Sequence, residues 1–332
     1  MKISKHLVLS FALLLLISIT AKAQENITQL LSGSLVDANT LSKAYLEPFG
    51  KGFGSSLNSG WYNSAKPHKL GGFDITFTIA TAIPPSSAKT FDVSKLHLNY
   101  WELQTPTNKL SPTVTGAKEI GPVLQSTIGP AATLTLPKGA GLKFIPAPII
   151  QVGIGLPFNT ELNARYLPEI NIPDVGKFSL WGIGVKNEFK EFIPVFKTLP
   201  FNVSAFLGYT KFKSSFDVNA PQPTPSKDQQ LNFNSSGYTA KLLISKSIPV
   251  LTVYAGIGYS KSTTDVALKG DYTINVQGVS SKYTDPITLD FANSGMNANI
   301  GLRIKLTVIA FHFDYTVGKY KLYNAGVGIN FR

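Results

Sequence analysis

The chain has 332 residues, of which 43% are hydrophobic and none is cysteine, and its formal net charge is +12. Without cysteine, neither a disulfide framework nor a thiolate metal site can form. The lysines are scattered rather than clustered, which does not favour a nucleic-acid partner. Anionic lipid headgroups or sugar phosphates fit an exported basic protein better, and a plain solvated surface needs no partner at all.

Residues 1–23 are predicted to be a signal peptide that is removed on export. A basic start is followed by an apolar run over residues 7–19, and Ala21 and Ala23 form the small-x-small pattern of a cleavage site. The run is shorter than the roughly 20 residues of a membrane-spanning helix, and a retained anchor is the alternative. No apolar run of that length follows, which disfavours a helical inner-membrane protein. Three lysines lie in this segment, so the mature chain keeps a charge of about +9.

One helical segment is predicted, over residues 26–47. Apolar residues recur there at steps of three and four, the pattern of an amphipathic helix. Pro48 is predicted to end the helix, because the residue before a proline avoids the α region. The glycines that follow would form a flexible exit: Gly50, Gly52 and Gly54. We therefore divide the mature chain into an N-terminal helical segment, 24–49, and a β-domain, 50–332.

Most of the chain after this helix alternates with a period of two. Segments of about ten residues carry apolar side chains on one face and polar side chains or glycine on the other, which is typical of transmembrane β-strands. A soluble β-sandwich alternates as well, but it would have to bury every apolar face in one core. Aromatic residues recur at the ends of these segments, as in an interfacial girdle: Tyr209, Tyr238, Tyr259, Tyr315 and Tyr323. We predict an all-β fold, a transmembrane antiparallel up-and-down β-barrel, with the N-terminal helix as a plug or a periplasmic segment.

The lengths of the connections predict how the strands cross the membrane. Barrels of this class have short periplasmic turns and longer outer loops. Counting back from a final strand that runs inward, the long connections fall on the outer side: 102–145, 213–235 and 261–293. The short turns fall on the periplasmic side: Ile83–Lys89, Leu156–Thr160, Lys190–Leu199, Ser247–Pro249 and Lys305–Thr307. This pattern predicts about twelve strands, or about fourteen if 266–291 or 112–136 adds a hairpin.

The polar faces of the strands would line the lumen and hold the candidate site. The glycines on these faces indicate either strand curvature or close packing of residues 26–47 as a plug: Gly182, Gly184, Gly256, Gly258, Gly301, Gly326 and Gly328. The charged residues there are interpreted as ion pairs with one another or as contacts to a bound compound: Glu161, Arg165, Arg303, Lys305, His312 and Asp314. No serine nucleophile stands near His312, and the chain has no HExxH or Walker A motif, so no catalysis, cofactor or metal is expected.

Three stretches of the chain resemble an uncharacterised family of outer-membrane β-barrel proteins. They are Leu46–Ala65, Gly155–Pro168, and Gly182–Lys186 with the following Ile193-Pro194. The resemblance covers most of the mature chain and implies a barrel in the bacterial outer membrane, with no assigned substrate. More remotely, a helical N-terminal segment that leads into a barrel is similar in architecture to the FadL-type transporters of long-chain fatty acids.

The predicted function is the binding or passage of a small hydrophobic compound at the bacterial outer membrane. The alternatives are a plugged structural or surface-interaction barrel without transport, a soluble secreted β-protein and, last, a lipid-acting barrel enzyme. We expect a monomer that contacts outer-membrane lipids. It would be inserted by the barrel-assembly machinery through its last strand, in which Phe331 lies on the lipid-facing side and Arg332 is one residue beyond.

Overall fold

A computed structural model of the protein describes residues 30, 34–129, 131–173, 176–190, 197, 200–217, 229–276 and 279–331. The predicted signal peptide, 1–23, lies outside these residues, as do nearly all of the positions before Ser34 in the predicted helix.

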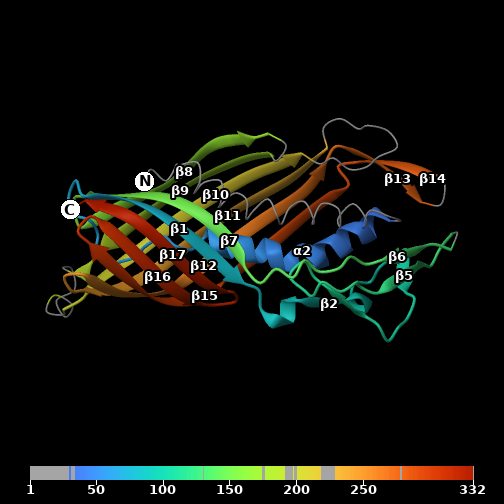
Figure 1. The fold of residues 1–332 in the computed structure, drawn as a ribbon, viewed down its shortest axis with the longest axis horizontal. Coiled ribbons are helices and arrows are strands. Elements are labelled where there is room, and N and C mark those ends of the chain that lie inside the picture. Colours follow the sequence, from blue (N-terminus) through green and yellow to red (C-terminus); the bar gives the residue numbers. More distant parts are fainter. Residues whose placement is uncertain are drawn as a thin grey trace, which may run out of the picture.

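The described residues form a closed antiparallel barrel in which each strand pairs with its neighbours in the chain and β1 pairs with β17 (Figure 1). The wall strands are β1 (Phe73–Ile83), β7 (Ile145–Leu156), β8 (Thr160–Ile172), β9 (Gly176–Glu188), β10 (Asn202–Asp217), β11 (Gln230–Ser247), β12 (Leu251–Lys269), β15 (Ile287–Leu306), β16 (Ile309–Val317) and β17 (Lys321–Phe331). The predicted up-and-down barrel is confirmed.

The barrel has ten strands, so the prediction of about twelve is wrong. The error begins at β1, whose last residue, Ile83, pairs with Lys321 at the start of β17. The connection after Ile83, predicted to be a periplasmic turn, therefore lies at the end of the barrel opposite to the predicted one, beside the β16–β17 turn. Residues 84–144 form one long connection there, since β7 returns directly along β1.

The two ends of the barrel differ as predicted. At one end, which we call the short-turn end, β7–β8, β11–β12 and β15–β16 are joined by tight connections: 157–159, 248–250 and 307–308. The other, the long-loop end, carries residues 84–144 and the hairpin of β13 (Asp271–Val276) and β14 (Val279–Thr284). This hairpin lies within the predicted segment 266–291, but it does not join the wall.

The described residues of two predicted loops, 213–235 and 261–293, are largely strand. β11, β12 and β15 have 18, 19 and 20 residues, against about 9–11 for one membrane crossing. The strands continue because apolar and polar residues still alternate there, but the apolar residues now lie on the inner face instead of the outer face. In the long-loop part of these strands and of β10, the apolar side chains point inward: Phe212, Phe216, Leu231, Phe233, Val266, Leu268, Leu289 and Phe291.

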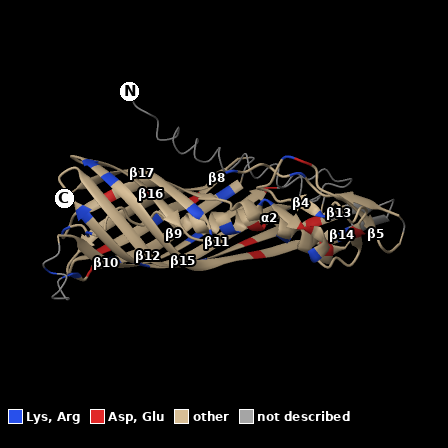
Figure 2. Ribbon diagram, turned by 90° about the horizontal axis from the view of Figure 1, so that it is seen from below, with Lys and Arg blue, Asp and Glu red and all other residues tan. Residues whose placement is uncertain are grey.

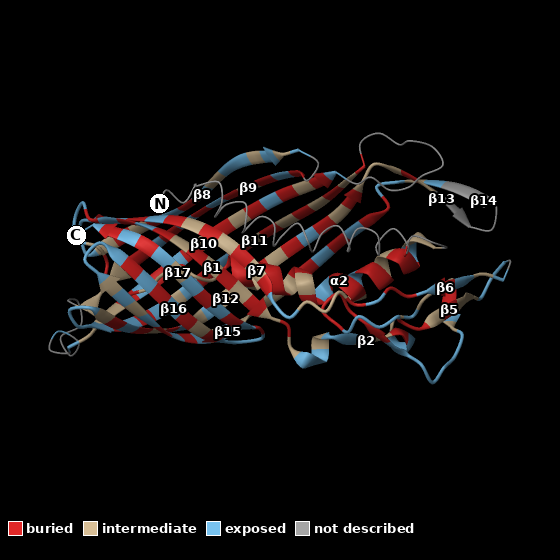
Figure 3. Cartoon of the chain, viewed as in Figure 1, coloured by how far each residue is buried: buried red, intermediate tan, exposed pale blue. Residues whose placement is uncertain are grey.

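The exchange of faces occurs at the tyrosines of the predicted girdle. Toward the short-turn end from Tyr209, Tyr238 and Tyr259, the outer face is apolar and the inner face is polar or glycine. Toward the long-loop end, the outer face of β11 becomes polar: Ser236, Asn234, Asn232 and Gln230. Figure 3 shows the alternation of buried and exposed residues along these strands, and Figure 2 shows charged residues at the short-turn rim and through the long-loop half.

One helix, α2 (Leu35–Leu57), lies inside the barrel, so of the two predicted alternatives the plug is correct. The helix passes through Pro48, contrary to the predicted end there and to a boundary at residue 49. Its glycines do not form a flexible exit but bring the helix against the wall: a Cβ at Gly52 would lie 2.5 Å from the side chain of Ile145. Among the described residues, no helix has the length and apolarity needed to cross a membrane.

Residues 84–144 cover the part of α2 that the wall leaves open. They form two small sheets, β2 (Thr90–Asp92) with β4 (Leu110–Pro112), and β3 (Trp101–Leu103) with β5 (Val123–Ser126) and β6 (Thr133–Thr135). The carboxylate of Asp37 in α2 accepts three backbone N–H bonds, from residues 99–101. The β5–β6 hairpin lies within the predicted segment 112–136, again outside the wall.

Candidate functional site

The interior of the barrel is filled by one continuous stretch of chain, residues 35–72, which we call the plug. α2 occupies the long-loop half, where its apolar side chains, among them Tyr45, Leu46 and Phe53, pack against the inward-facing apolar residues of the wall. Residues 58–72 continue through the short-turn half and lead directly into β1. The plug thus crosses the whole lumen before the wall begins.

Arg165, on β8, holds the point at which α2 ends. It is 1% exposed, and its guanidinium donates to the carbonyl oxygens of Leu57 at 2.8 Å and Ser59 at 2.6 Å. Its Nε donates to Gln151, and the guanidinium carbon lies 3.5 Å from the ring centroid of Trp61. The last carbonyls of a helix have no partner within it, and a cation is favoured there by the helix dipole. Arg165 supplies both the hydrogen-bond donors and the positive charge at this end of α2.

The indole ring of Trp61 packs against several glycines of the wall. A Cβ at Gly182, Gly184 or Gly208 would come within 3.2, 3.1 or 2.9 Å of the indole ring. At Gly256, a Cβ would lie 2.5 Å from the hydroxyl of Tyr62. Four of the predicted glycines, Gly258, Gly301, Gly326 and Gly328, have residues of the wall as their nearest neighbours. Gly182, Gly184, Gly208 and Gly256 mark close packing of a plug, one of the two predicted interpretations. The residues that they contact belong to 58–65 rather than to the predicted 26–47.

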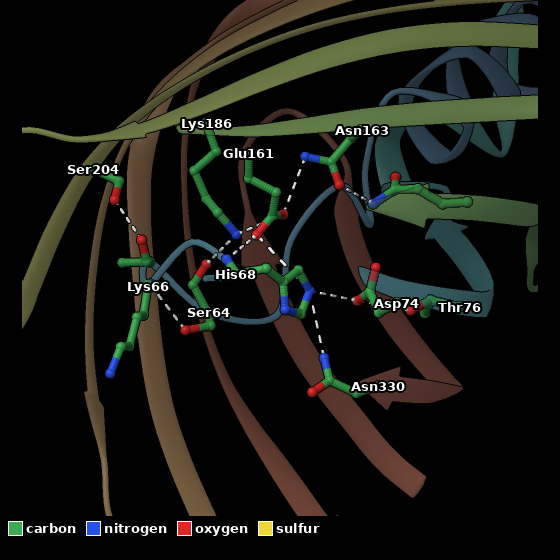
Figure 4. A network of polar contacts seen from close by, with 12 residues as sticks. Ser64, Lys66, His68, Asp74, Thr76, Glu161, Asn163, Lys186, Ser204 and Asn330 are labelled. Carbon is green, nitrogen blue, oxygen red and sulfur yellow. Dashed lines mark hydrogen bonds and ion pairs between the residues drawn. The ribbon is translucent and has the colours of Figure 1, made fainter. Parts of the chain in front are cut away.

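A charged network ties the last part of the plug to the wall near the short-turn end (Figure 4). The carboxylate of Glu161 lies 2.9 Å from the ammonium of Lys186 and accepts the backbone N–H of His68 at 3.0 Å. Nε2 of His68 lies 3.5 Å from Asp74, and Lys186 also donates to the carbonyl of Ser64. Because these charges are buried, each needs such partners to offset the loss of water.

All six predicted site residues point into the barrel, but they do not pair with one another. His312 contacts Thr78 at 3.2 Å, and Lys305 donates to Asn330 at 2.6 Å. Asp314 accepts from Tyr254 and Asn324 at 3.1 and 2.7 Å. The predicted neighbours have other partners instead, and Arg303 and Lys305 cannot pair with each other because both are cations.

Arg303 is the sixth predicted residue. Its Nε is buried without a hydrogen-bond partner among the described residues, and it lines a small hollow of about 20 Å³ beside His68, Asp74 and Lys186. Sequence reasoning missed Trp61, His68, Lys186 and Lys241. Only the folded plug brings Trp61 and His68 to the lumen, whereas the alternation of β9 and β11 could have shown that Lys186 and Lys241 face inward.

A second opening, which we call the side hollow, lies between the plug and the wall, at the place where the wall strand β16 is shorter than its neighbour β15. β15 pairs with β16 only from Ala298 onward, so its edge from Ile287 to Asn297 has no strand partner on that side. The outer part of the hollow has a volume of about 320 Å³ and the inner part about 60 Å³. The two parts share Asn293, Lys319 and Tyr320 in their lining.

The inner part of the side hollow is lined mainly by polar side chains. Amides and hydroxyls come from the plug and from β11, β12, β15 and β17: Ser55, Asn58, Ser59, Thr239, Ser260, Ser262, Asn293, Asn297, Asn299 and Asn324. Lys241 crosses β12 at Gly258, its paired residue, and reaches Asn297 on β15. The arrangement can hold a polar molecule but offers no nucleophile with an adjacent base. The described ranges also contain no cluster of His, Asp and Glu that could hold a metal ion.

The family described as "Family of unknown function (DUF6588)" matches residues 1–331, and the chain belongs to this family. No curated protein matches the chain.

Several solved structures are similar in outline. They include Ail, the attachment invasion locus protein of Yersinia pestis, in complex with the heparin analogue sucrose octasulfate (9% identity, TM-score 0.29, 79% of this chain and 99% of that chain). The translocator domain of the autotransporter NalP from Neisseria meningitidis is 12% identical, with a TM-score of 0.31 over 80% of this chain and 89% of that chain. The outer membrane protease OmpT from Escherichia coli is 8% identical, with a TM-score of 0.29 over 78% and 97%. Such values transfer no activity to this chain.

Proposed function

We propose that this member of the DUF6588 family is a barrel of the bacterial outer membrane whose lumen is closed by the plug, and that it binds a small polar compound in the side hollow. The observation that carries the membrane assignment is the exchange of the two faces of the wall at Tyr209, Tyr238 and Tyr259. Between this girdle and the short-turn end the wall is apolar outside, as lipid requires, and beyond the girdle it is polar outside, as water requires.

Strand lengths support this position in the membrane. β16, β17 and β1 have 9, 11 and 11 residues, which fits one crossing. β11, β12 and β15 continue for about nine more residues, which at the tilt of barrel strands extends them by about 20 Å beyond the girdle. The long-loop half would then stand outside the cell as a cup around α2. Many large apolar side chains are exposed on the short-turn half, which disfavours the soluble alternative.

The last strand suits the proposed insertion by the barrel-assembly machinery. Phe331 is exposed on the outer face of β17, and its ring stacks on that of Phe73 with centroids 4.9 Å apart. Phe331 therefore lies on the face that would contact lipid in the proposed membrane position, next to the strand pair that closes the barrel.

Binding is better supported than passage, and a polar compound better than a hydrophobic one. The apolar part of the inner wall packs against α2, so it offers little free lining to a hydrophobic compound. The side hollow, in contrast, is open and lined by amides, hydroxyls and lysines. Passage would require Arg165, Lys186 and Glu161 to release the plug, each at the cost of unpaired buried groups.

The membrane position can be tested by quenching of tryptophan fluorescence with brominated lipids. The chain has three tryptophans. Trp181 is 48% exposed on the outer face, whereas Trp61 and Trp101 are 2% and 3% exposed. In reconstituted vesicles, Trp181→Phe should remove most of the quenching, and Trp101→Phe, the matched control, should leave it unchanged. Equal quenching in the wild type and in Trp181→Phe would refute the proposed position.

Closure of the lumen can be tested by swelling of liposomes in sugar solutions. Liposomes that contain the protein should swell no faster than liposomes without protein, while a water-filled porin at the same ratio serves as the positive control. Swelling by the wild-type protein would show that the plug leaves the lumen, and it would support passage over binding.

A further inference from the structure

The side hollow carries positive charge that its own residues do not neutralise. Lys241 lines the inner part and bonds to the amide oxygen of Asn297, and Lys319 lies on the β16–β17 turn where both parts meet. Among the described residues, no carboxylate lies within ion-pair distance of either ammonium. The inner part has one lining carboxylate, Asp314, which accepts from Tyr254 and Asn324 and also attracts Lys241 from beyond ion-pair distance.

The structure also keeps Lys319 over the hollow. Its stem lies along the edge of β15, where a Cβ at Gly295 would lie 3.6 Å from its Cε. In the outer part, Lys51 of α2 is paired with Glu47, so its charge is already neutralised. When Asp314 is counted against Lys241 and Glu47 against Lys51, the lining keeps one uncompensated positive charge, that of Lys319, where the two parts of the hollow meet.

Two buried polar atoms of the plug lack partners where the inner part of the hollow begins. Oδ1 of Asn58 and Nε1 of Trp61 have no hydrogen bond among the described residues, and both residues line the hollow. Asn58 is 5% exposed, and its amide nitrogen is already committed to the carbonyls of Tyr238 and Lys261. A hydroxyl group, which both donates and accepts, can partner either kind of atom.

These features are suited to the same class of ligand. Amides and hydroxyls that line a cavity recognise several hydroxyl groups, and two lysines recognise one negative charge. The inner part, at about 60 Å³, holds only one edge of a sugar, so the rest of the molecule would lie in the outer part, which at about 320 Å³ falls in the size range of small-molecule sites. In the proposed membrane position, the entrance lies just outside the girdle residues Tyr315 and Tyr323, and it opens to the external medium.

We propose that the side hollow binds an anionic saccharide, that is, a sugar that carries a phosphate or a carboxylate. The sugar hydroxyls would contact the asparagine and serine side chains of the inner part, and the anionic group would lie between Lys241 and Lys319. This inference rests on the proposed function, because it names the class of compound that the side hollow takes.

Isothermal titration calorimetry on the full-length protein in detergent tests this proposal with four probes: glucose 6-phosphate, glucuronate, glucose and inorganic phosphate. The two charged sugars should bind, with glucose and phosphate each at least about tenfold weaker, because a hydrogen bond to a charged group contributes on that scale. Equal binding of glucose would overturn the anionic part of the proposal. Equal binding of phosphate would overturn the saccharide part, and no binding of any probe would overturn both.

Variants assign the binding to the hollow. Lys241→Gln and Lys319→Gln should each weaken glucose 6-phosphate by at least about tenfold and leave glucose unchanged. Lys213→Gln, on the polar outer face of β10, is the matched control and should bind as the wild type does. Lys319 is an exposed turn residue, so its variant remains informative if Lys241→Gln fails to fold. Unchanged affinity in Lys319→Gln would overturn the site, whereas failure of the membrane assignment would appear separately in the quenching of Trp181.

Discussion

Arg165→Met should release the plug from the lumen without unfolding the wall. The substitution leaves the buried carbonyl oxygens of Leu57 and Ser59 without donors and removes the cation from the ring of Trp61. An unpaired buried polar group costs about 1–3 kcal/mol, and a desolvated cation–π contact contributes about 1–2 kcal/mol. Arg165 has no carboxylate partner among the described residues, so loss of its desolvation penalty offsets part of this. We expect the plug to be held about 2–4 kcal/mol less tightly.

The assay uses the fluorescence of Trp61 in a background that carries Trp101→Phe and Trp181→Phe. Release of the plug exposes the indole to water, so its emission should move to longer wavelength, and residues 58–72 should become sensitive to protease. Lys305→Met is the matched control, because Lys305 also lies in the lumen but donates to Asn330 of the wall. If Arg165→Met folds into a barrel and Trp61 keeps the emission and protease resistance of the wild type, the argument that Arg165 holds the plug is refuted.

Three further predictions concern α2, the β13–β14 hairpin and the whole barrel. Gly50→Ala should destabilise the plug, because the new Cβ overlaps the ring of Phe291, although alanine favours a helix by about 1 kcal/mol. Chemical denaturation should show the loss of stability. Phe291→Ala in the same chain should restore it. Hydrogen bonds from Lys269 and the N–H of Gly270 hold the pKa of Asp285 below its usual value. The contact is therefore complete above the ordinary carboxyl pKa of about 4 and is lost as the pH falls through the lowered pKa; the amide NMR signal of Gly270 should titrate there, and Asp285→Asn should abolish that titration. Finally, the unboiled protein should migrate differently from the boiled protein on a detergent gel, and identical migration would contradict a stable barrel.

Sequence reasoning identified the barrel because its evidence is local. The period of two, the tight turns at Leu156–Thr160 and Lys305–Thr307, and the tyrosines at the strand ends are all visible within a few residues. The inward direction of the six candidate charges followed from the same alternation. Each of these features is set by the geometry of a single strand, so no partner strand is needed to predict it.

The candidate site was predictable only as a set of lumen-facing positions. Glu161 pairs with Lys186 on the neighbouring strand and with the backbone of His68 in the plug, rather than with Arg165 on its own strand. The register between strands and the path of the plug decide the actual partners, and both are tertiary properties. The side hollow is even harder to predict from the sequence, because it exists only where β16 is shorter than β15.

The sequence by itself determined the fold class, the tight turns and the residues that face the lumen, because alternation and turn chemistry act over short distances. Only the tertiary structure decided the strand number, the continuation of α2 through Pro48 and the exchange of faces beyond the tyrosines. A helix tolerates a proline when packing against a wall offsets the lost hydrogen bond. An alternating strand shows which residues share a face, but whether lipid, water or a plug covers that face depends on everything packed around it.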